Sequence, residues 1–236
     1  MKSIRMASAA FLFAAMSPVL SGCGEGQPEL TAGETQGTII ELTAEQARQF
    51  EVNSGGTWDE KIVGGFVVLN EELTEEQKQA FKEDMLTREQ KAEQERAGDV
   101  QAQWCSGYYL SNVQYKGNTF YFSNRRLGSS EGWGPITLSL TVSTSVSAQW
   151  SANVGVSAEV VSAGVGYSVT ATYGVSSQGS WNVPSGSYGR LEGYALHDKH
   201  TWDVWNDDCG DPADTYSGNG SSYRPNGGVY FKKVIL

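Results

Sequence analysis

Hydrophobic and polar residues alternate strictly along one long stretch of the chain. From residue 138 to 160 the even positions are mostly apolar, as at Leu138 and Val146, while the odd positions are Ser, Thr, Gln, Asn, Gly or Glu. At Val160-Val161 the phase reverses, and the odd positions are apolar as far as residue 175. Alternation with period two is typical of a strand with one apolar face, whereas ordinary strands average about 5–6 residues. The two runs therefore predict a long β-hairpin over residues 138–175, with its tip at Glu159.

Charge is nearly absent from this part of the chain. Of the 58 residues between Glu131 and Arg190, Glu159 alone is charged. Exposed strands of soluble proteins usually carry charged residues that prevent pairing with other molecules. The hairpin must therefore have a partner surface. The sequence predicts a mainly β fold: an elongated antiparallel β domain with a long amphipathic hairpin, preceded by a short acidic helical region.

Two partner surfaces fit the apolar face of the hairpin. In one arrangement this face contacts lipid and the Ser/Thr face contacts water, as in strands that cross a membrane. In the other, the strands bend and pack on the rest of the domain as a β-sandwich, with the Ser/Thr face in solvent. In the first arrangement Glu159 lies at the leading tip. The lipid-facing residues are then Val142, Val146, Trp150, Val154, Val156, Val165, Val169 and Tyr173.

The hairpin and its flanks resemble a known family. An uncharged Ser/Thr-Val hairpin within a β-rich, aromatic domain is similar to the stem of the aerolysin-like β-pore-forming proteins, and residues 181–186 (WNVPSG) with Tyr188-Gly189 resemble the return strand of that group. The resemblance covers residues 104–205. It implies a homo-oligomer on a lipid membrane, in which each chain contributes one hairpin to a shared barrel. Two features depart from the family: a predicted lipid anchor, and the lack of an evident receptor-binding domain.

An acidic segment precedes the β domain. Residues 24–99 hold 18 acidic and 7 basic residues, against 9 and 8 in residues 100–236. A short repeat places the pattern Thr-x-x-Gln at Thr43 and again at Thr74. This pattern is typical of a capping box, so two helices are expected to start there. We predict an acidic helical arm over residues 38–99, with a short strand or buried loop at 61–70, and a β domain over residues 100–236.

Further elements of the β domain follow from turn residues and apolar runs. Residues 188–196 and 228–235 are predicted strands. Lys116-Gly117-Asn118 predicts a hairpin turn between strands at 108–115 and 119–122. The Asp-, Gly-, Ser- and Pro-rich residues 206–227 predict a long surface loop.

The N-terminus carries the features of an export signal. Lys2 and Arg5 precede a mostly apolar run over residues 6–20, which ends in Leu20-Ser21-Gly22-Cys23. These four residues resemble the lipobox of bacterial lipoproteins, in which the Cys becomes the lipidated N-terminus. Residues 1–22 are thus a predicted lipoprotein signal peptide and residues 23–37 a tether. The expected location is extracytoplasmic, anchored to the cell envelope through Cys23; the alternative is an ordinary secretory signal and a secreted protein.

Two further cysteines remain after such processing. In an oxidising compartment Cys105 and Cys209 are candidates for a disulfide, and the alternative is two buried free thiols. The loop that this bridge would close has about a hundred residues, for which the chain-entropy model gives roughly 4–5 kcal/mol of stabilisation.

Composition and motifs argue against several functions. The formal net charge of -10 argues against nucleic acid as a partner. Gly128-Ser129-Ser130-Glu131-Gly132 has the spacing of a nucleophile elbow, but lacks the helix that should follow it. His197 and His200 would point to opposite faces of a strand, so no metal site is expected. We predict neither enzymatic activity nor a cofactor. The alternative to an oligomerising membrane protein is a surface-displayed module that binds a glycan or protein ligand.

Overall fold

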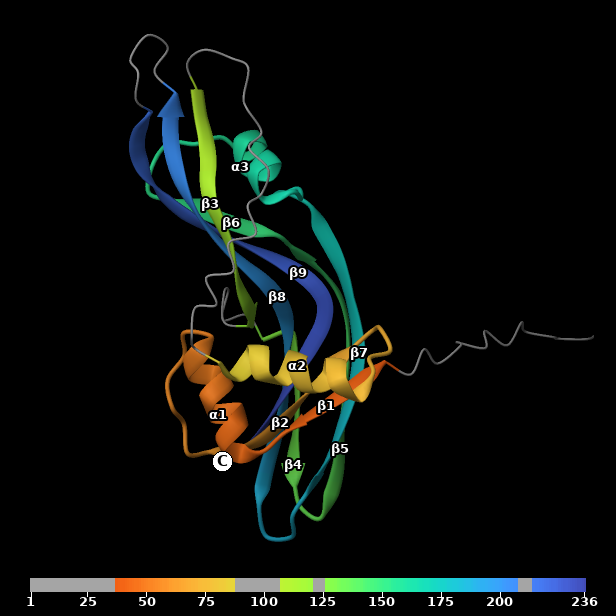
Figure 1. Ribbon diagram of the computed structural model, residues 1–236. Coiled ribbons are helices and arrows are strands. Elements are labelled where there is room, and N and C mark those ends of the chain that lie inside the picture. The colour runs from red at the N-terminus through yellow and green to blue at the C-terminus, as the bar shows by residue number, and fades with distance from the viewer. Residues whose placement is uncertain (1–36, 88–106, 121–125, 208–213) are drawn as a thin grey trace, which may run out of the picture. The chain divides into compact units, whose positions relative to one another are not determined.

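The computed structural model describes residues 37–87, 107–120, 126–207 and 214–236 (Figure 1). The strands are β1 (Thr38–Leu42), β2 (Ile62–Leu69), β3 (Gly107–Thr119), β4 (Gly128–Trp133), β5 (Ile136–Ser147), β6 (Gln149–Ala152), β7 (Thr172–Val183), β8 (Tyr188–Asp207) and β9 (Thr215–Ile235). The helices are α1 (Ala44–Asn53), α2 (Glu75–Leu86) and α3 (Ala158–Val165). The described part of the chain is mainly β and its paired strands are antiparallel, which confirms the predicted fold class.

Two long strands form the centre of a seven-stranded sheet. Strands β8 and β9, of 20 and 21 residues, pair with each other along most of their length. At one end they are flanked by β4 on β8 and by β2 on β9, and β1 pairs with β2. At the other end they are flanked by β3 on β8 and by β6 on β9. A second sheet contains β5 and β7 only.

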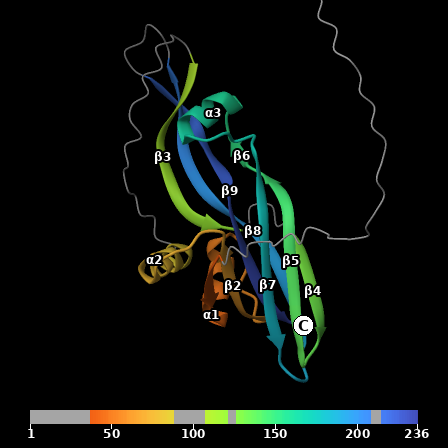
Figure 2. The same cartoon turned by 90° about the vertical axis from the view of Figure 1, so that its right-hand side faces the viewer.

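Alternate residues of the central strands point to opposite faces of the sheet and pack in two different cores. Val229 and Phe231 of β9 belong to a core shared with β5 and β7, whereas Tyr230 between them packs with Phe50 of α1 and Met85 of α2. The sheet therefore has α1 and α2 on one face and the two-stranded sheet on the other (Figure 2). Because both faces are covered, β2 is apolar along nearly its whole length rather than alternating.

The acidic segment is part of this fold. Thr43 and Thr74 cap α1 and α2 with complete capping boxes, as predicted. The predicted strand at 61–70 is β2, which pairs with β9 and brings β1 into the same sheet. Residues 38–86 are therefore not a separate helical arm, because their apolar residues complete the core on the helical face of the sheet. Residues 88–99 of the predicted arm lie outside the described residues.

Buried charges connect the helical layer to the sheet. Lys232 of β9 lies 3.3 Å from a carboxylate oxygen of Glu51 in α1 and 3.5 Å from one of Glu192 in β8. Burial raises the pKa of Glu51, while Lys232 lowers it to a smaller extent. Burial alone would raise the pKa of Glu192, but hydrogen bonds from Tyr194 and Arg126 and the charge of Lys232 lower it. The cation thus compensates two carboxylates that would otherwise be costly to bury.

Three local predictions are changed by the structure. The predicted strands at 188–196 and 228–235 are confirmed, but both belong to the much longer β8 and β9. The predicted loop at 206–227 is wrong from Thr215 onward, because β9 starts there. The predicted turn at Lys116-Gly117-Asn118 is also wrong: β3 continues through it, and Gly117, with φ of 82°, lies in a register shift against β8. A glycine with positive φ therefore marks a bulge here rather than a turn.

Candidate functional site

Strands β5 and β7 form a two-stranded ribbon that is the base of the predicted hairpin. The pairing runs without a register shift from Ile136–Val183 to Ser147–Thr172. One further hydrogen bond, 2.8 Å from the Ala148 amide to the Ala171 carbonyl oxygen, continues the same register. This register is the one expected of a hairpin whose turn lies at Glu159-Val160.

The apolar face of the ribbon packs on the seven-stranded sheet. Leu138, Leu140 and Val142 of β5 and Val175 of β7 are buried in one core with residues of β2, β8 and β9. Gly179 permits this close approach, since a Cβ atom there would lie 2.8 Å from the Phe66 ring and 2.9 Å from the Phe231 ring. In this structure the ribbon is thus the second layer of a sandwich.

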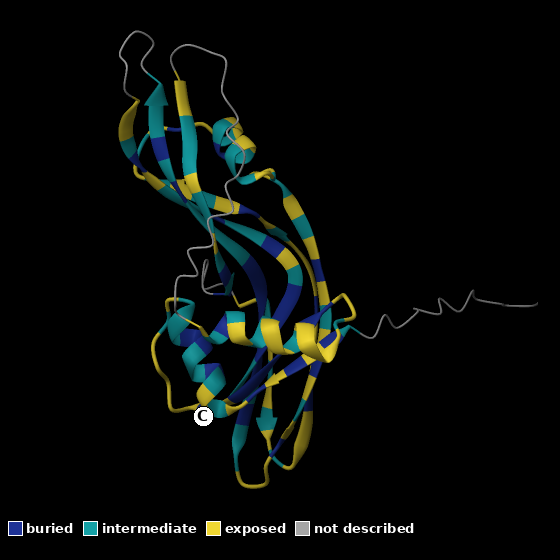
Figure 3. Ribbon diagram, viewed as in Figure 1, coloured by how far each residue is buried: buried dark blue, intermediate teal, exposed yellow. Residues whose placement is uncertain are grey.

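The opposite face of the ribbon is exposed and carries no charge. Exposed outward positions alternate with buried or half-buried ones along most of both strands, as the exposure colours of β5 and β7 show (Figure 3). The outward residues are Thr137, Ser139, Thr141, Ser143, Ser145, Ser147, Thr172, Gly174, Ser176, Gln178, Ser180 and Asn182. A water-facing surface made of hydroxyl, amide and glycine groups alone is unusual, because exposed strands generally carry Lys or Glu.

Beyond the ribbon the chain departs from the predicted hairpin. We call residues 148–171 the tip segment. Its first strand, β6, pairs with β9, with Ser151 opposite Ser221. Its centre forms α3, and the chain then returns to β7. The predicted continuous strands over residues 138–175 are therefore interrupted, and Glu159 lies in the first turn of a helix rather than at a β-turn.

Helix α3 has its own start and stop signals. The Ser157 hydroxyl accepts a hydrogen bond from the Val160 amide, and Gly166 ends the helix in the left-handed conformation, with φ of 76°. Glu159 is fully exposed in the first turn, where hydrogen bonds from its own backbone amide and from Ser157 lower its pKa. Ser157, Glu159 and Gly166 are typical helix-boundary residues. They are the sequence signal for α3, which the prediction of a continuous hairpin did not take into account.

The tip segment packs against the ends of β3, β8 and β9 that are drawn at the top of Figure 1. Val156, Val161 and Val169 are buried together with Trp202 and Val204 of β8. Polar contacts also hold the segment in this position. The Asn153 side-chain oxygen accepts a hydrogen bond of 2.8 Å from the Asn219 amide, and the Asn153 amide donates one of 3.1 Å to the Asn219 carbonyl. The hydroxyls of Tyr167 and Ser222 lie 2.5 Å apart.

Two titratable groups lie at this contact. Burial raises the pKa of Tyr167, so the phenol remains neutral, and the Arg224 guanidinium carbon lies 5.2 Å from the centre of its ring. The His200 ring is 5.6 Å from the Tyr167 ring, and burial lowers its pKa. Burial at this contact thus favours the neutral forms of Tyr167 and His200.

The structure places the residues predicted to face lipid inside the protein. Val142, Val156 and Val169 are buried, and Val146, Trp150, Val154, Val165 and Tyr173 are half-buried. Val142 and Val146 contribute to the ribbon core, and Trp150, Val154, Val156, Val165 and Val169 belong to the tip-segment core. In this state, then, the sheet and not lipid covers the apolar face.

Several predicted sites lie outside the described residues. These are the signal peptide at 1–22, residues 23–36 of the predicted tether at 23–37, Cys23, and the Cys105 and Cys209 pair. Within the described ranges, no group of three or more His, Cys, Asp or Glu side chains could hold a metal ion. None of the helices described is long and apolar enough to span a membrane.

Comparisons with known proteins give little similarity. No family model matches the chain, and no curated protein matches it. Among solved structures it has a weak similarity to the parasporin-2 toxin of Bacillus thuringiensis, a toxin that recognizes cancer cells. The TM-score is 0.22 at 14% identity, over 56% of this chain and 68% of the toxin. A TM-score this low carries no argument, so the function has to be inferred from the residues of this chain.

Proposed function

We propose that this is a membrane-associated oligomerising protein in which the ribbon of β5 and β7 extends into one continuous hairpin. In the described structure the tip segment is packed on the sheet. On a membrane it leaves β9, its helix unfolds, and its two halves pair with each other. One chain supplies too few strands to close a barrel, so several copies are needed, each contributing one hairpin.

The register of the ribbon is the observation that carries this proposal. Continued past Ala148 and Ala171 without a shift, it pairs Trp150 with Val169 and Val154 with Val165 on the apolar face. On the other face it pairs Ser151 with Ser168. Apolar residues therefore meet apolar ones and polar residues meet polar ones or glycine as far as the turn. A segment that only ever formed β6 and α3 would not need this matching.

The energetics make the extension dependent on lipid. Val156, Val161 and Val169 are buried against β8, and exposing each of them to water would cost roughly 1.5–3 kcal/mol. Lipid can receive the apolar face, and the new cross-strand hydrogen bonds can replace those of β6 and α3. We therefore expect the packed state in water and the extended state only at a membrane.

Disulfide trapping of the tip segment tests the proposal. Ser151 and Ser221 are direct partners in β6 and β9, and antiparallel partners lie within the reach of a disulfide. The double variant S151C/S221C, once oxidised, should release no dye from liposomes on which the wild-type protein causes leakage and forms oligomers. Reduction should restore leakage. Wild-type protein in the same reductant controls for Cys105 and Cys209.

A second cross-link provides the matched control. Ser143 and Ser176 are partners in the ribbon and remain partners in the extended hairpin. The oxidised S143C/S176C variant should therefore leak as the wild type does. Leakage by the oxidised S151C/S221C variant would contradict the proposal. Wild-type protein that leaves vesicles intact across pH and lipid composition would instead favour a surface-displayed β-sandwich that binds a glycan or protein ligand.

For the location of the protein we propose the cell envelope, with lipidated Cys23 as the anchor. The support is the sequence Leu20-Ser21-Gly22-Cys23 after a short apolar run. Incorporation of a labelled fatty acid into the wild-type protein and its loss in Cys23→Ser would test this. Labelling that persists in Cys23→Ser would contradict it, and release of unlabelled wild-type protein into the medium would favour a secreted protein.

A further inference from the structure

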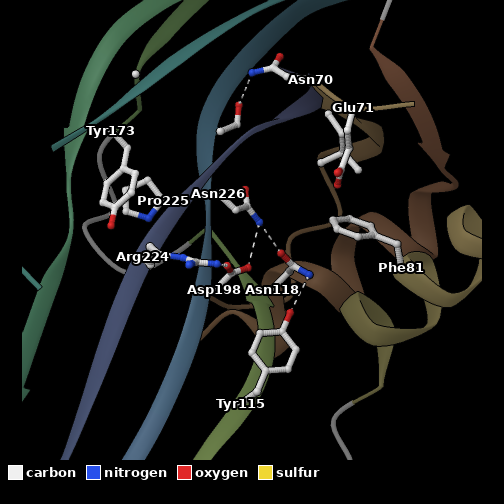
Figure 4. Close-up of a pocket in the computed structure, with 13 residues that line it drawn as sticks. Asn70, Glu71, Phe81, Tyr115, Asn118, Tyr173, Asp198, Arg224, Pro225 and Asn226 are labelled. Carbon is white, nitrogen blue, oxygen red and sulfur yellow. Dashed lines mark hydrogen bonds and ion pairs between the residues drawn. The ribbon is translucent and has the colours of Figure 1, made fainter. Parts of the chain in front are cut away.

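A cavity of about 680 Å³ lies beside the central strands. Arg224 in its lining also contacts the ring of Tyr167 in the tip segment. Its lining comes from the turn before α2, from α2 itself and from β3, β7, β8 and β9 (Figure 4). Small-molecule sites in proteins are typically about 300–1,000 Å³. The volume of this cavity lies within that range.

Four polar side chains form a connected network in this cavity. The Arg224 guanidinium donates to one oxygen of Asp198 at 2.7 Å, and the Asn226 amide nitrogen donates to the other at 3.2 Å. The same Asn226 nitrogen donates to the Asn118 side-chain oxygen at 2.7 Å. Figure 4 shows these groups side by side between Tyr173 and Phe81, and they come from three different strands. Carboxylate and amide oxygens can each accept more than one hydrogen bond, so the network retains acceptor capacity for a ligand.

Helix α2 holds the network in place. An oxygen of Asp84 accepts hydrogen bonds from the Asn118 side-chain nitrogen at 3.1 Å and from the Asn118 backbone amide at 3.2 Å. Burial, together with the charges of Asp84 and Asp198, raises the pKa of Tyr115, so its hydroxyl stays protonated. A site whose polar groups are already oriented loses less entropy on binding.

Aromatic rings complete the lining. Tyr173 of β7, Tyr115 of β3 and Phe81 of α2 border the cavity around the polar network. Rings with an apolar face pack well against the C–H surface of a sugar, while amide, carboxylate and guanidinium groups hydrogen-bond its hydroxyls, which both donate and accept. We propose that this cavity binds a neutral saccharide.

The charge balance favours a neutral ligand over an ion. Arg224 and Asp198 pair within the cavity, and Glu71 also lines it. An anion would therefore meet two carboxylates, and a cation would meet the guanidinium. Breaking the pair to bind an ion would leave one charge without its partner, which is costly in a partly buried site. Hydroxyl groups can be added to the pair without breaking it.

Calorimetry with a panel of free neutral saccharides tests the proposal. Glucose, galactose, mannose and N-acetylglucosamine, each as the monosaccharide and a short oligomer, would be titrated into the full chain up to millimolar concentrations. At least one should bind. Tyr173→Ala and Asp198→Asn should each weaken that binding about tenfold or more, whereas Tyr173→Phe, which keeps the ring, should bind as the wild type does. Asn182→Ala, on the outward face of the ribbon, is the matched control and should have no effect.

Each alternative outcome has a definite meaning. Binding that is unchanged in both Tyr173→Ala and Asp198→Asn, with circular dichroism spectra like that of the wild type, would overturn the assignment to this cavity. The lack of binding by every saccharide in the panel would overturn the proposal. Binding of choline or inorganic phosphate in place of saccharides would overturn the ligand class. None of these measurements uses a membrane, so the result is independent of the proposed hairpin extension.

Discussion

The ribbon and the tip segment have the same alternation of residues but different structures. In the ribbon, residues 136–147 and 172–183 are regular strands. In the tip segment, residues 148–171, the same pattern gives one short strand and a helix. The ribbon lies over a sheet that accepts a flat apolar face, while the tip segment packs against Trp202 and Val204. The comparison teaches that alternation defines which residues share a face, but the available partner decides the backbone.

The tip segment can satisfy two periodicities. In the helix, Ala158, Val161 and Val165 lie three and four residues apart and so share one face. All three belong to the tip-segment core. In an extended hairpin, apolar and polar residues of the same segment instead alternate along each strand, and the two strands meet at Glu159-Val160. Few sequences fit both patterns, and a segment that does can change structure when its surroundings change.

The largest expected effect comes from a charge on the packed face of the ribbon. Val142 is 3% exposed and lies in the core beneath the ribbon. Val142→Asp should lower the free energy of unfolding by about 4 kcal/mol or more, because a carboxylate would be buried without a partner. Its neighbour Ser143 is exposed, so Ser143→Asp should change it by less than about 0.5 kcal/mol. Urea unfolding measures both, and equal stabilities would show that the ribbon does not pack on the sheet.

Acid should destabilise the folded protein, because His197 takes up a proton more readily in the unfolded chain. This ring is 3% exposed, and burial lowers its pKa to about 4. The unfolded chain therefore binds the proton more readily, so stability is full above about pH 6.5 and falls as the pH drops toward 4. The loss at pH 4 is on the order of 3 kcal/mol.

Urea unfolding at a series of pH values measures this effect. In His197→Gln, the part of the pH dependence of stability between pH 6.5 and 4 that comes from this ring should vanish. Lys199→Gln, a change at a half-buried neighbour, should leave it in place. A wild-type stability that does not change over this range would show that His197 is not buried as described.

Much of the fold could be predicted because its signals are local. The capping boxes at Thr43 and Thr74 predict α1 and α2, and the apolar run at 61–70 predicts β2. The joining of β2 to β9 could not be predicted, since it depends on pairing between residues more than 150 positions apart. A net charge of -11 over residues 24–99 instead indicated a separate acidic helical arm. Within the described part of this segment, Glu45, Glu75, Glu76 and Glu83 are exposed on the helices, while the apolar residues of α1, α2, β1 and β2 complete the core.

The candidate site, like the fold, could be predicted from the sequence only in part. The two faces of β5 and β7 and the register in which they pair follow from alternation alone. Helix α3 depends on competition between that alternation and the boundary residues Ser157 and Gly166, which tertiary packing resolves. The cavity could not be predicted, because Asn118, Asp198 and Asn226 come from three strands.

A charge within the tip segment separates the packed state from the extended one. Val154 is half-buried, so Val154→Asp should lower the free energy of unfolding by only about 1–2 kcal/mol. On the lipid face of the hairpin the same charge is unfavourable in every subunit, and leakage from liposomes should be abolished. Ser151→Asp lies on the opposite face and should leave leakage intact. Leakage by the Val154→Asp protein would exclude this face from contact with lipid.

The smallest expected effect concerns the helix that competes with the hairpin. Ser157→Ala removes the side-chain cap of α3 and should destabilise the packed tip segment by about 1 kcal/mol. The population of the extended form should then rise by about fivefold, and leakage should start correspondingly sooner. Thr74→Ala removes the equivalent cap from α2, so it should cost similar stability without changing leakage. If both variants accelerate leakage equally, loss of general stability explains the effect; if Ser157→Ala alone does so, unfolding of α3 is a step on the path to the membrane.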